Sequence, residues 1–228
     1  MELFYNQEID TNKKEFEFDK HESIHISKVL RKKKGDIVQV TNGSGLSIKV
    51  KLIEFNNKYV KGQIITIKKH SLNTNLPHIA ISPIKSISRF EWFLEKATEI
   101  GVKRITPIIC KNTIKKKINL IRFKKIIQSA LKQSNQFHIP KIDPPIKYDD
   151  FINCKSNGFI THCSIGSRTS IKKIDVGKNP LFLIGPEGDF SLSEIELAKK
   201  QNFTPISLGN QRFRTETAAI YVCFQCLK

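Results

Sequence analysis

Short runs of alternating apolar and polar residues dominate the first part of the chain, and such alternation is typical of half-buried β-strands. The pattern predicts strands at residues 2–5, 16–18, 36–41, 47–55 and 58–68. One helix is expected at residues 21–31, followed by Lys32-Lys33-Lys34-Gly35, a cationic last turn with a glycine stop. Asn42-Gly43 and Gly45 supply a hairpin turn between two of the strands. Residues 1–70 are therefore expected to form a small β-barrel domain.

The polar, turn-prone linker at residues 70–77 is followed by a second pattern, in which strands and helices alternate. Apolar runs predict strands at residues 78–82, 104–109, 158–161, 181–184 and 205–208. Helical spacing predicts helices at residues 89–100, 120–136, 192–200 and 215–226. This alternation indicates a parallel sheet covered on both faces, so residues 78–228 are expected to form one α/β domain.

Two glycine-containing segments near the end of the chain carry the candidate chemistry. In the first, the apolar run 181–184 stops at Gly185-Pro186, and Gly188 follows. Because neither glycine has a side chain, a ligand can approach the backbone there. Ser191 and Glu194 then form a capping-box pattern, which indicates the start of a helix.

The second segment repeats this arrangement. An apolar stretch ends at Leu208-Gly209, a polar loop follows, and a helix is expected to begin near Thr215. Loops from neighbouring strand ends meet at the carboxyl edge of a parallel sheet, where small molecules commonly bind. The two segments therefore predict one small-molecule site.

The sequence of these segments resembles the RsmE family, the SPOUT-class methyltransferases that use S-adenosylmethionine (SAM) to methylate uracil N3 in 16S ribosomal RNA. The match runs through Ile184–Ser191, Leu208-Gly209 and the string Arg214-Thr-Glu-Thr-Ala218. Weaker matches are Phe90–Val102 with Pro107, and His25–Arg31 with Gly35-Asp36. The resemblance thus covers the whole chain in the family's order.

The resemblance implies a PUA-like RNA-binding barrel followed by a SPOUT domain with a C-terminal trefoil knot. It implies SAM as cofactor, 16S rRNA of the small ribosomal subunit as substrate, and a homodimer. The matching positions give the expected cofactor-binding residues Ile184, Gly185, Pro186, Glu187, Gly188, Leu208, Gly209, Phe213 and Arg214.

Arg214 and Glu216 are the expected catalytic residues. The methyl group of SAM is already electrophilic, so the enzyme mainly has to align it with the nucleophile. Loss of the proton from uracil N3 spreads negative charge onto O2 and O4, and the Arg214 guanidinium is a suitable group to stabilise that charge. For Glu187 and Glu216 an alternative stays open, because loop bonding and the helix dipole each favour an acid there.

Three positions depart from the family's pattern. Asp189 stands where the family usually repeats a glycine, although Asp tolerates a left-handed backbone better than most residues. Gln211 and Gln136 each occupy a place where arginine is usual, and Arg212 directly follows the first of them.

The net charge of the chain indicates what kind of molecule it binds. The chain has 39 Lys and Arg against 21 Asp and Glu, a formal charge of +18, which is typical of a protein that binds a polyanion. Residues 111–147 contain ten Lys or Arg and one acid, Asp143. Such depletion of acids favours a phosphate-facing surface, although a lysine-rich composition alone is the alternative. The expected RNA-binding residues are Arg31, Lys32, Lys115, Lys116, Lys117 and Lys124.

Several other classes of function are disfavoured. His21-Glu-Ser-Ile-His25 matches a zinc-protease motif but lacks a third ligand, and Cys223-Phe-Gln-Cys226 supplies half a zinc site, so no metal is expected. The nucleotide-binding glycine motifs of Rossmann and P-loop enzymes are absent from the sequence. Five irregularly spaced cysteines, and no apolar run long enough to span a membrane, favour a cytoplasmic protein.

Two alternatives remain open at this stage. One is a SPOUT ribose 2′-O-methyltransferase, in which Arg214 would act on a hydroxyl group. The other is an RNA-binding assembly factor that keeps the fold without activity, although the complete Arg214-Thr-Glu-Thr string argues against inactivity.

Overall fold

The computed structural model describes residues 2–56, 59–163 and 167–227. The chain divides into two compact units, Met1–Leu72 with Leu131–Ile139, and Asn73–Ala130 with Pro140–Lys228. The segment Leu131–Ile139 belongs to the first unit because its backbone bonds to a turn there. Gly45 N donates to Phe137 O (2.8 Å) and Ile139 N donates to Gly43 O (2.8 Å).

The first unit is built on a five-stranded sheet in the order β1-β3-β4-β5-β2. β1 pairs with β3 in parallel, and the other neighbours are antiparallel. The side chains of Val38, Val40, Ile48, Val50 and Leu52 form its core and are completely buried. The strands are β1 (Leu3–Tyr5), β2 (Glu15–Glu17), β3 (Ile37–Thr41), β4 (Leu46–Phe55) and β5 (Val60–Lys69). The expected start of the last strand, Lys58, lies outside the described residues.

The helix expected at residues 21–31 is present, but it spans residues 20–29 and only its first half is α-helical. A short α-helix, α1 (Lys20–Ile24), leads into a π-helical turn, η1 (His25–Val29), in which Leu30 N donates to His25 O (2.9 Å). The wider turn inserts one residue, a change that apolar spacing alone does not reveal. The chain then leaves the helix through Arg31, which has a left-handed backbone with φ 51°.

The second unit contains an eight-stranded sheet in the order β11-β13-β10-β12-β6-β7-β8, with β9 paired to β7, and every pairing in it is parallel. The predicted parallel α/β architecture is therefore confirmed. The strands are β6 (His78–Ile81), β7 (Arg104–Ile109), β8 (Lys141–Ile142), β9 (Ile146–Lys147), β10 (Gly158–Thr161), β11 (Thr169–Ser170), β12 (Leu181–Ile184) and β13 (Phe203–Ser207).

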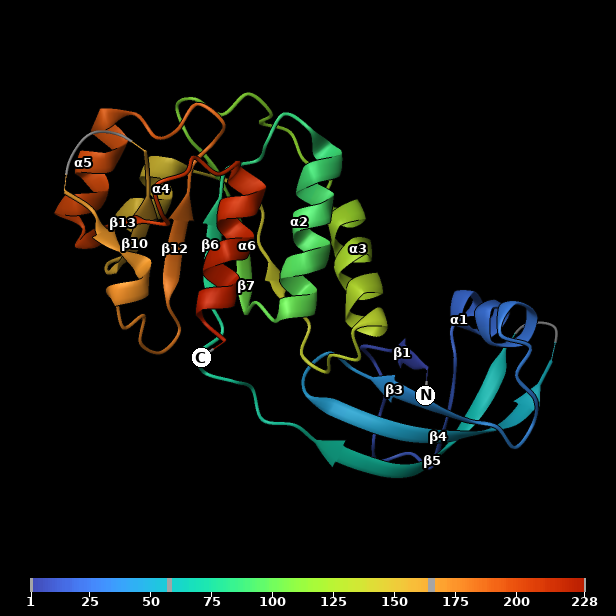
Figure 1. Cartoon of the computed structure of the whole chain (residues 1–228). Coiled ribbons are helices and arrows are strands. Elements are labelled where there is room, and N and C mark those ends of the chain that lie inside the picture. The colour runs from blue at the N-terminus through green and yellow to red at the C-terminus, as the bar shows by residue number, and fades with distance from the viewer. Residues whose placement is uncertain (1, 57–58, 164–166, 228) are drawn as a thin grey trace. The chain divides into compact units, whose positions relative to one another are not determined.

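Helices cover both faces of this sheet (Figure 1). One face carries α2 (Ile87–Ile100), α3 (Leu120–Gln133) and α6 (Thr215–Gln225), and the Phe90 and Phe123 rings stack between α2 and α3 at 5.1 Å. The other face carries α4 (Tyr148–Asn153) and α5 (Leu192–Lys200). A short 3-10 turn, η2 (Ile171–Lys173), follows β11. The expected trefoil knot stays a prediction.

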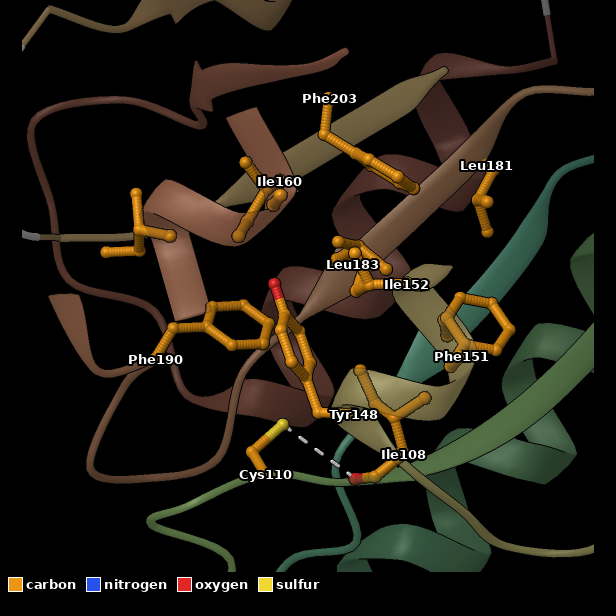
Figure 2. Packing of buried hydrophobic residues seen from close by; sticks show 13 residues of the cluster. Ile108, Cys110, Tyr148, Phe151, Ile152, Ile160, Leu181, Leu183, Phe190 and Phe203 are labelled. Atoms are coloured by element: carbon orange, nitrogen blue, oxygen red, sulfur yellow. Dashed lines mark hydrogen bonds between the residues drawn. The ribbon is translucent and has the colours of Figure 1, made fainter. Parts of the chain in front are cut away.

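Strand β12 shows why the sheet is buried on both sides. Leu181 and Leu183 point into the cluster formed by α4, α5 and neighbouring strands, as Figure 2 shows. The alternate residues, Phe182 and Ile184, are also buried, with 0% and 1% exposure. A strand that is apolar at every position is expected when both faces of a parallel sheet are covered.

Candidate active site

The carboxyl ends of β10, β12 and β13 open onto a pocket of about 320 Å³ in the second unit. The sequence builds it there because three apolar strands end side by side in loops rich in glycine and polar residues. Its walls come from five places: the ends of these three strands with the loops that follow, and the first turns of α2 and α6. The lining residues are Arg89, Thr161, His162, Cys163, Arg168, Ile184, Gly185, Pro186, Glu187, Asp189, Ile206, Ser207, Leu208, Gly209, Gln211, Arg212, Phe213, Arg214, Thr215, Glu216 and Ala218.

The loop that follows β12 is tied by hydrogen bonds to the start of α6 and to the segments that follow β6 and β7. Thr215 Oγ1 donates to Gly185 O (2.9 Å), which joins this loop to the start of α6. Lys85 N donates to Glu187 Oε1 (2.8 Å). Asn112 Nδ2 donates to Gly188 O (3.1 Å) and to Asp189 O (3.0 Å). The loop is therefore fixed before any ligand arrives, which lowers the entropy cost of binding.

Asp189 adds a fourth tie. Its φ of 62° lies in the left-handed region, so the departure from glycine occurs where Asp is better tolerated than most residues. The carboxylate accepts from Cys163 N through Oδ2 (2.7 Å) and from Phe190 N through Oδ1 (2.8 Å). The side chain thus links the loop after β12 to the loop after β10.

Phe190 anchors the end of this loop in the core. Its ring lies beside the Tyr148 ring, with centroids 5.5 Å apart (Figure 2). Tyr148 Oη donates to Glu194 O at 2.8 Å. Burial raises the pKa of the Tyr148 hydroxyl, so this donor stays protonated. A Cβ on Gly185 would come within 3.0 Å of the Phe190 ring, so a residue without a side chain is needed there. The predicted capping box between Ser191 and Glu194 is confirmed.

The second loop enters α6 through Arg214. Ser207 Oγ donates to Gly209 O (3.1 Å), and Gly209 has a φ of 145°. The Phe213 ring stacks on the Tyr221 ring with centroids 5.6 Å apart. Arg214 is the N-cap of α6, with an extended backbone, and its carbonyl oxygen accepts from Ala218 N (2.8 Å). The backbone of Arg214 is therefore held at the start of α6, and its exposed side chain lines the pocket.

Four arginines and three acids contribute to the lining, so cationic side chains outnumber anionic ones. Arg168 Nη1 donates to His162 O (2.6 Å). Arg89 Nε lies 3.9 Å from Glu216 Oε1, and Glu216 is only 7% exposed. A pocket with apolar walls and several charged side chains of both signs suits a ligand that has both apolar and polar parts.

The predicted cofactor-binding residues meet at this pocket with one exception. Gly188 is not part of the lining, and a Cβ added there would meet Asn112 Cβ at 3.3 Å instead. A small residue at 188 thus serves the contact with Asn112, and its contact with the cofactor stays a prediction. Glu216, predicted as catalytic, belongs to the lining together with Arg214.

The predicted RNA-binding residues lie outside the pocket lining and stay predictions. Lys115, Lys116 and Lys117 are exposed in the segment between β7 and α3, and Lys124 is exposed on α3. Arg31 and Lys32 belong to the first unit, where Lys32 Nζ lies 3.6 Å from Glu2 Oε2.

Sequence reasoning missed several residues of the site. Arg89 directly precedes the family-like string Phe90–Val102, which was a usable signal. Arg168 and Asn112 lie in loops without a recognisable motif, so only the folded chain reveals them. Of the departures from the family's pattern, Gln211 lines the pocket together with Arg212, whereas Gln136 belongs to the first unit.

The disfavoured motifs also have structural explanations. Cys223 and Cys226 are buried at 0% and 2% exposure, and burial raises both thiol pKa values, that of Cys226 to about 12. Within residues 2–56, 59–163 and 167–227, three or more His, Cys, Asp or Glu side chains nowhere gather closely enough to hold a metal ion. Over the same residues, each helix is too short or too polar to cross a membrane.

Comparison with known proteins agrees with this fold and site. A family model described as an RNA methyltransferase domain matches residues 73–226, which include the whole pocket. A second one, described as an RNA methyltransferase PUA domain, matches residues 18–65. The fold and the site thus define an RNA methyltransferase with an N-terminal PUA-like domain.

Individual relatives show which kind of RNA methyltransferase the chain resembles. Ribosomal RNA small subunit methyltransferase E of Mesomycoplasma hyopneumoniae is 35% identical over 186 residues, 78% of this chain and 80% of the relative. A probable rRNA-methyltransferase from Porphyromonas gingivalis has a TM-score of 0.90 at 32% identity, covering 98% of this chain and 96% of the other. A Legionella pneumophila protein described as a methyltransferase was solved with bound SAM, and it has a TM-score of 0.87 at 26% identity over 98% and 96% of the two chains. The chain belongs to the RsmE family of ribosomal RNA small subunit methyltransferases.

Proposed function

We propose that this protein transfers the methyl group of SAM to N3 of one uridine in 16S rRNA. The observation that carries the proposal is the pocket itself, in which the two glycine loops and Arg214 come together at the carboxyl edge of the sheet. The relatives named as small subunit rRNA methyltransferases support the same substrate. We place the reaction in the cytoplasm, on the small ribosomal subunit, and expect the enzyme to act as a homodimer.

The residues present fit SAM. Leu208, which is partly exposed, and the buried Ile184 and Ile206 behind it provide an apolar wall suited to the adenine ring. Gly185 and Gly209 let backbone N–H and C=O groups reach the polar parts of the ligand without interference from side chains. When bound, SAM supplies an electrophilic methyl group, and the protein has to orient it and exclude water.

Arg214 and Glu216 are our candidates for the catalytic residues. The Arg214 guanidinium has a planar array of donors that suits the carbonyl oxygens flanking uracil N3, where negative charge develops when the proton leaves. Glu216 lies in the same first turn of α6 and is a candidate acceptor for that proton. A fall in kcat for Glu216→Gln with unchanged SAM affinity would support this role, whereas an unchanged kcat would exclude it.

The exposed lysines supply the contact with RNA in this proposal. Lys115, Lys116, Lys117 and Lys124 lie in the acid-poor stretch of the second unit, and Arg31 and Lys32 belong to the PUA-like unit. Phosphate contacts of this kind give affinity without reading the sequence. Because N3 takes part in base pairing, the target uracil must be unpaired or extruded before transfer.

Mass spectrometry of 16S rRNA from cells with and without the gene tests the proposal. We expect one 3-methyluridine to disappear from the mutant RNA and to return when purified protein and SAM are added to mutant subunits. Appearance of a 2′-O-methylated nucleotide instead would identify a ribose methyltransferase. Binding to the subunit without any methylation would identify an assembly factor. Sedimentation of the purified protein tests the homodimer.

A further inference from the structure

Arg89 is the one cationic side chain of the pocket that comes from neither glycine loop nor from the β10–β11 connection. It lies in the first turn of α2, which packs beside α6 (Figure 1). Its side chain is 48% exposed, although it lines the pocket. Arg89 is therefore accessible both to the pocket and to solvent.

Glu216 is the counter-charge nearest to Arg89. The Glu216 side chain is only 9% exposed, and its Oε1 lies 3.9 Å from Arg89 Nε. Among the described residues, this is the one ion pair of Glu216. A buried carboxylate is costly without a counter-charge, so the attraction of Glu216 favours a guanidinium position near α6.

The ion pair uses the Nε side of the Arg89 guanidinium, so the side with the two Nη groups can bind another partner. Glu216 is approached from the Nε side, and no described residue accepts a hydrogen bond from the two Nη groups of Arg89. The Nη groups can donate two parallel hydrogen bonds to the oxygens of a phosphate, an arrangement that lysine cannot reproduce. Arg89 can therefore bind a second anion in addition to Glu216.

We propose that Arg89 binds a phosphodiester group of the RNA next to the target uridine, and that Glu216 positions it for this contact. The inference rests on the proposed function and assigns a substrate-binding role to the pair. A phosphodiester fits better than SAM, because the half-exposed side chain faces solvent, whereas the cofactor is expected at the buried glycine loops. It also fits better than the uracil ring, which carries no full charge before its proton leaves.

Three variants test the proposal on small subunits that lack the modification. Arg89→Gln removes the charge, and Arg89→Lys keeps it but loses the two-pronged geometry. Lys96→Gln is the matched control, because Lys96 lies two turns further along the same helix, outside the pocket, and is paired with Glu95 and Glu99. Methyl transfer is measured over a range of RNA and salt concentrations, and SAM affinity by calorimetry.

We expect Arg89→Gln to raise KM for the subunit about tenfold, with kcat and SAM affinity within about twofold of the wild type, because one phosphate contact is lost. The slope of log KM against log salt should become shallower by roughly one unit. Arg89→Lys should keep the slope and recover part of the KM. Lys96→Gln should behave as the wild type.

A double-mutant cycle tests the positioning role of Glu216. Glu216→Gln should raise KM in the wild-type background but not in the Arg89→Gln background, because its effect on RNA binding passes through Arg89. The cycle is read in KM, since direct participation of Glu216 in proton removal would change kcat. Additive effects on KM would show that the two residues act independently and would overturn the positioning role.

Other outcomes overturn the proposal as a whole. An unchanged KM and salt slope in Arg89→Gln would leave Arg89 with a purely structural ion pair. Lost SAM affinity would assign Arg89 to the cofactor, and a lower kcat with an unchanged slope would assign it to the base. If the wild type itself fails to methylate the subunit, the proposed function falls as well. An active wild type with an unaffected Arg89→Gln overturns this inference alone.

Discussion

The two edges of the parallel sheet in the second unit use polar side chains in different ways. At the carboxyl edge, polar side chains hold loops in place, and arginines extend into the pocket. At the amino edge, polar side chains bond to one another. There His78 Nε2 donates to Thr106 Oγ1 (2.7 Å), which itself donates to Asp143 Oδ2. Arg104 closes the network with two bonds to Asp143, at 2.6 and 3.0 Å.

Charged and polar side chains therefore serve stability at the amino edge and ligand binding at the carboxyl edge. At the amino edge each carboxylate oxygen of Asp143 has a donor inside the protein, so the network contributes to stability and offers little to a ligand. At the carboxyl edge, the Arg214 side chain is exposed in a pocket, where its donors are available. Changes at the amino edge should alter stability, and changes at the carboxyl edge should alter activity.

The largest effect is expected from His78 and concerns stability at acid pH. Burial lowers the pKa of His78 to about 4, and the charge of Arg104 adds to this effect. As the pH falls from 6.5 to 4, the unfolded chain binds this proton before the folded protein does. The free energy of unfolding should therefore decrease over this range, by at most about 3 kcal/mol at about 1.4 kcal/mol per pKa unit.

His78→Gln provides the comparison, because it keeps a hydrogen-bond donor but does not titrate. Its stability should change less than that of the wild type between pH 6.5 and pH 4. Below this range both proteins should lose stability as Asp143 is protonated, because the bonds from Arg104 and Thr106 outweigh burial and lower its pKa. Denaturation can be followed by the fluorescence of Trp92, the single tryptophan, which lies in the second unit. If the free energy of unfolding changes with pH in the same way in both proteins, His78 is not the cause of the loss of stability.

Arg214→Lys should have the next largest effect, on catalysis alone. It keeps the charge but loses the planar head that can span the uracil imide edge. Methyl transfer should fall by at least about ten- to a hundredfold, or roughly 1.4–2.7 kcal/mol of transition-state stabilisation, with thermal stability and SAM affinity near those of the wild type. If SAM affinity falls in proportion to the rate, Arg214 belongs to the cofactor site instead.

The sequence predicted the carboxyl edge far better than the amino edge. The glycine loops and the start of α6 are encoded locally, by a few consecutive residues such as Gly185-Pro186 and the capping box at Ser191. The network joins His78 to Thr106, 28 positions away, and Thr106 to Asp143, a further 37 positions away, so no local sequence pattern predicts it.

The same distinction explains the errors in the predicted fold. The long strands and helices were found because their apolar periodicity extends over many residues. The two-residue strands β8, β9 and β11 were missed because their pairing depends on neighbours rather than on their own sequence. The segment Leu131–Ile139 joins the first unit through contacts with residues distant in the sequence: its backbone bonds to Gly43 and Gly45, the Phe137 ring stacks on His70, and Lys132 pairs with Glu22.

Asp189 allows a smaller test at the carboxyl edge. Asp189→Gly restores the residue usual in the family but removes the bonds from Cys163 N and Phe190 N. Because the loop becomes less ordered, the Kd for SAM should rise by about five- to tenfold, which is the loss of about one hydrogen bond. Asp189→Asn tolerates the left-handed backbone and keeps one acceptor, so calorimetry should give an intermediate Kd. An unchanged Kd in Asp189→Gly would show that the bonds made by Thr215, Glu187 and Asn112 are enough to hold the loop.

The smallest effect is expected when a single lysine is changed to glutamine. The same change at each edge of the sheet allows the two edges to be compared in RNA binding. Lys116 follows the carboxyl end of β7, whereas Lys141 lies at the amino edge, 3.8 Å from Asp143 Oδ1. Both belong to the acid-poor stretch and both side chains are exposed, so Lys→Gln changes the same charge in each. If RNA meets the carboxyl edge, Lys116→Gln should flatten the salt dependence of RNA binding by roughly one unit of slope, and Lys141→Gln should leave it unchanged. Equal slopes for the two variants would mean that the excess of lysine is a property of the whole surface, without a preferred edge.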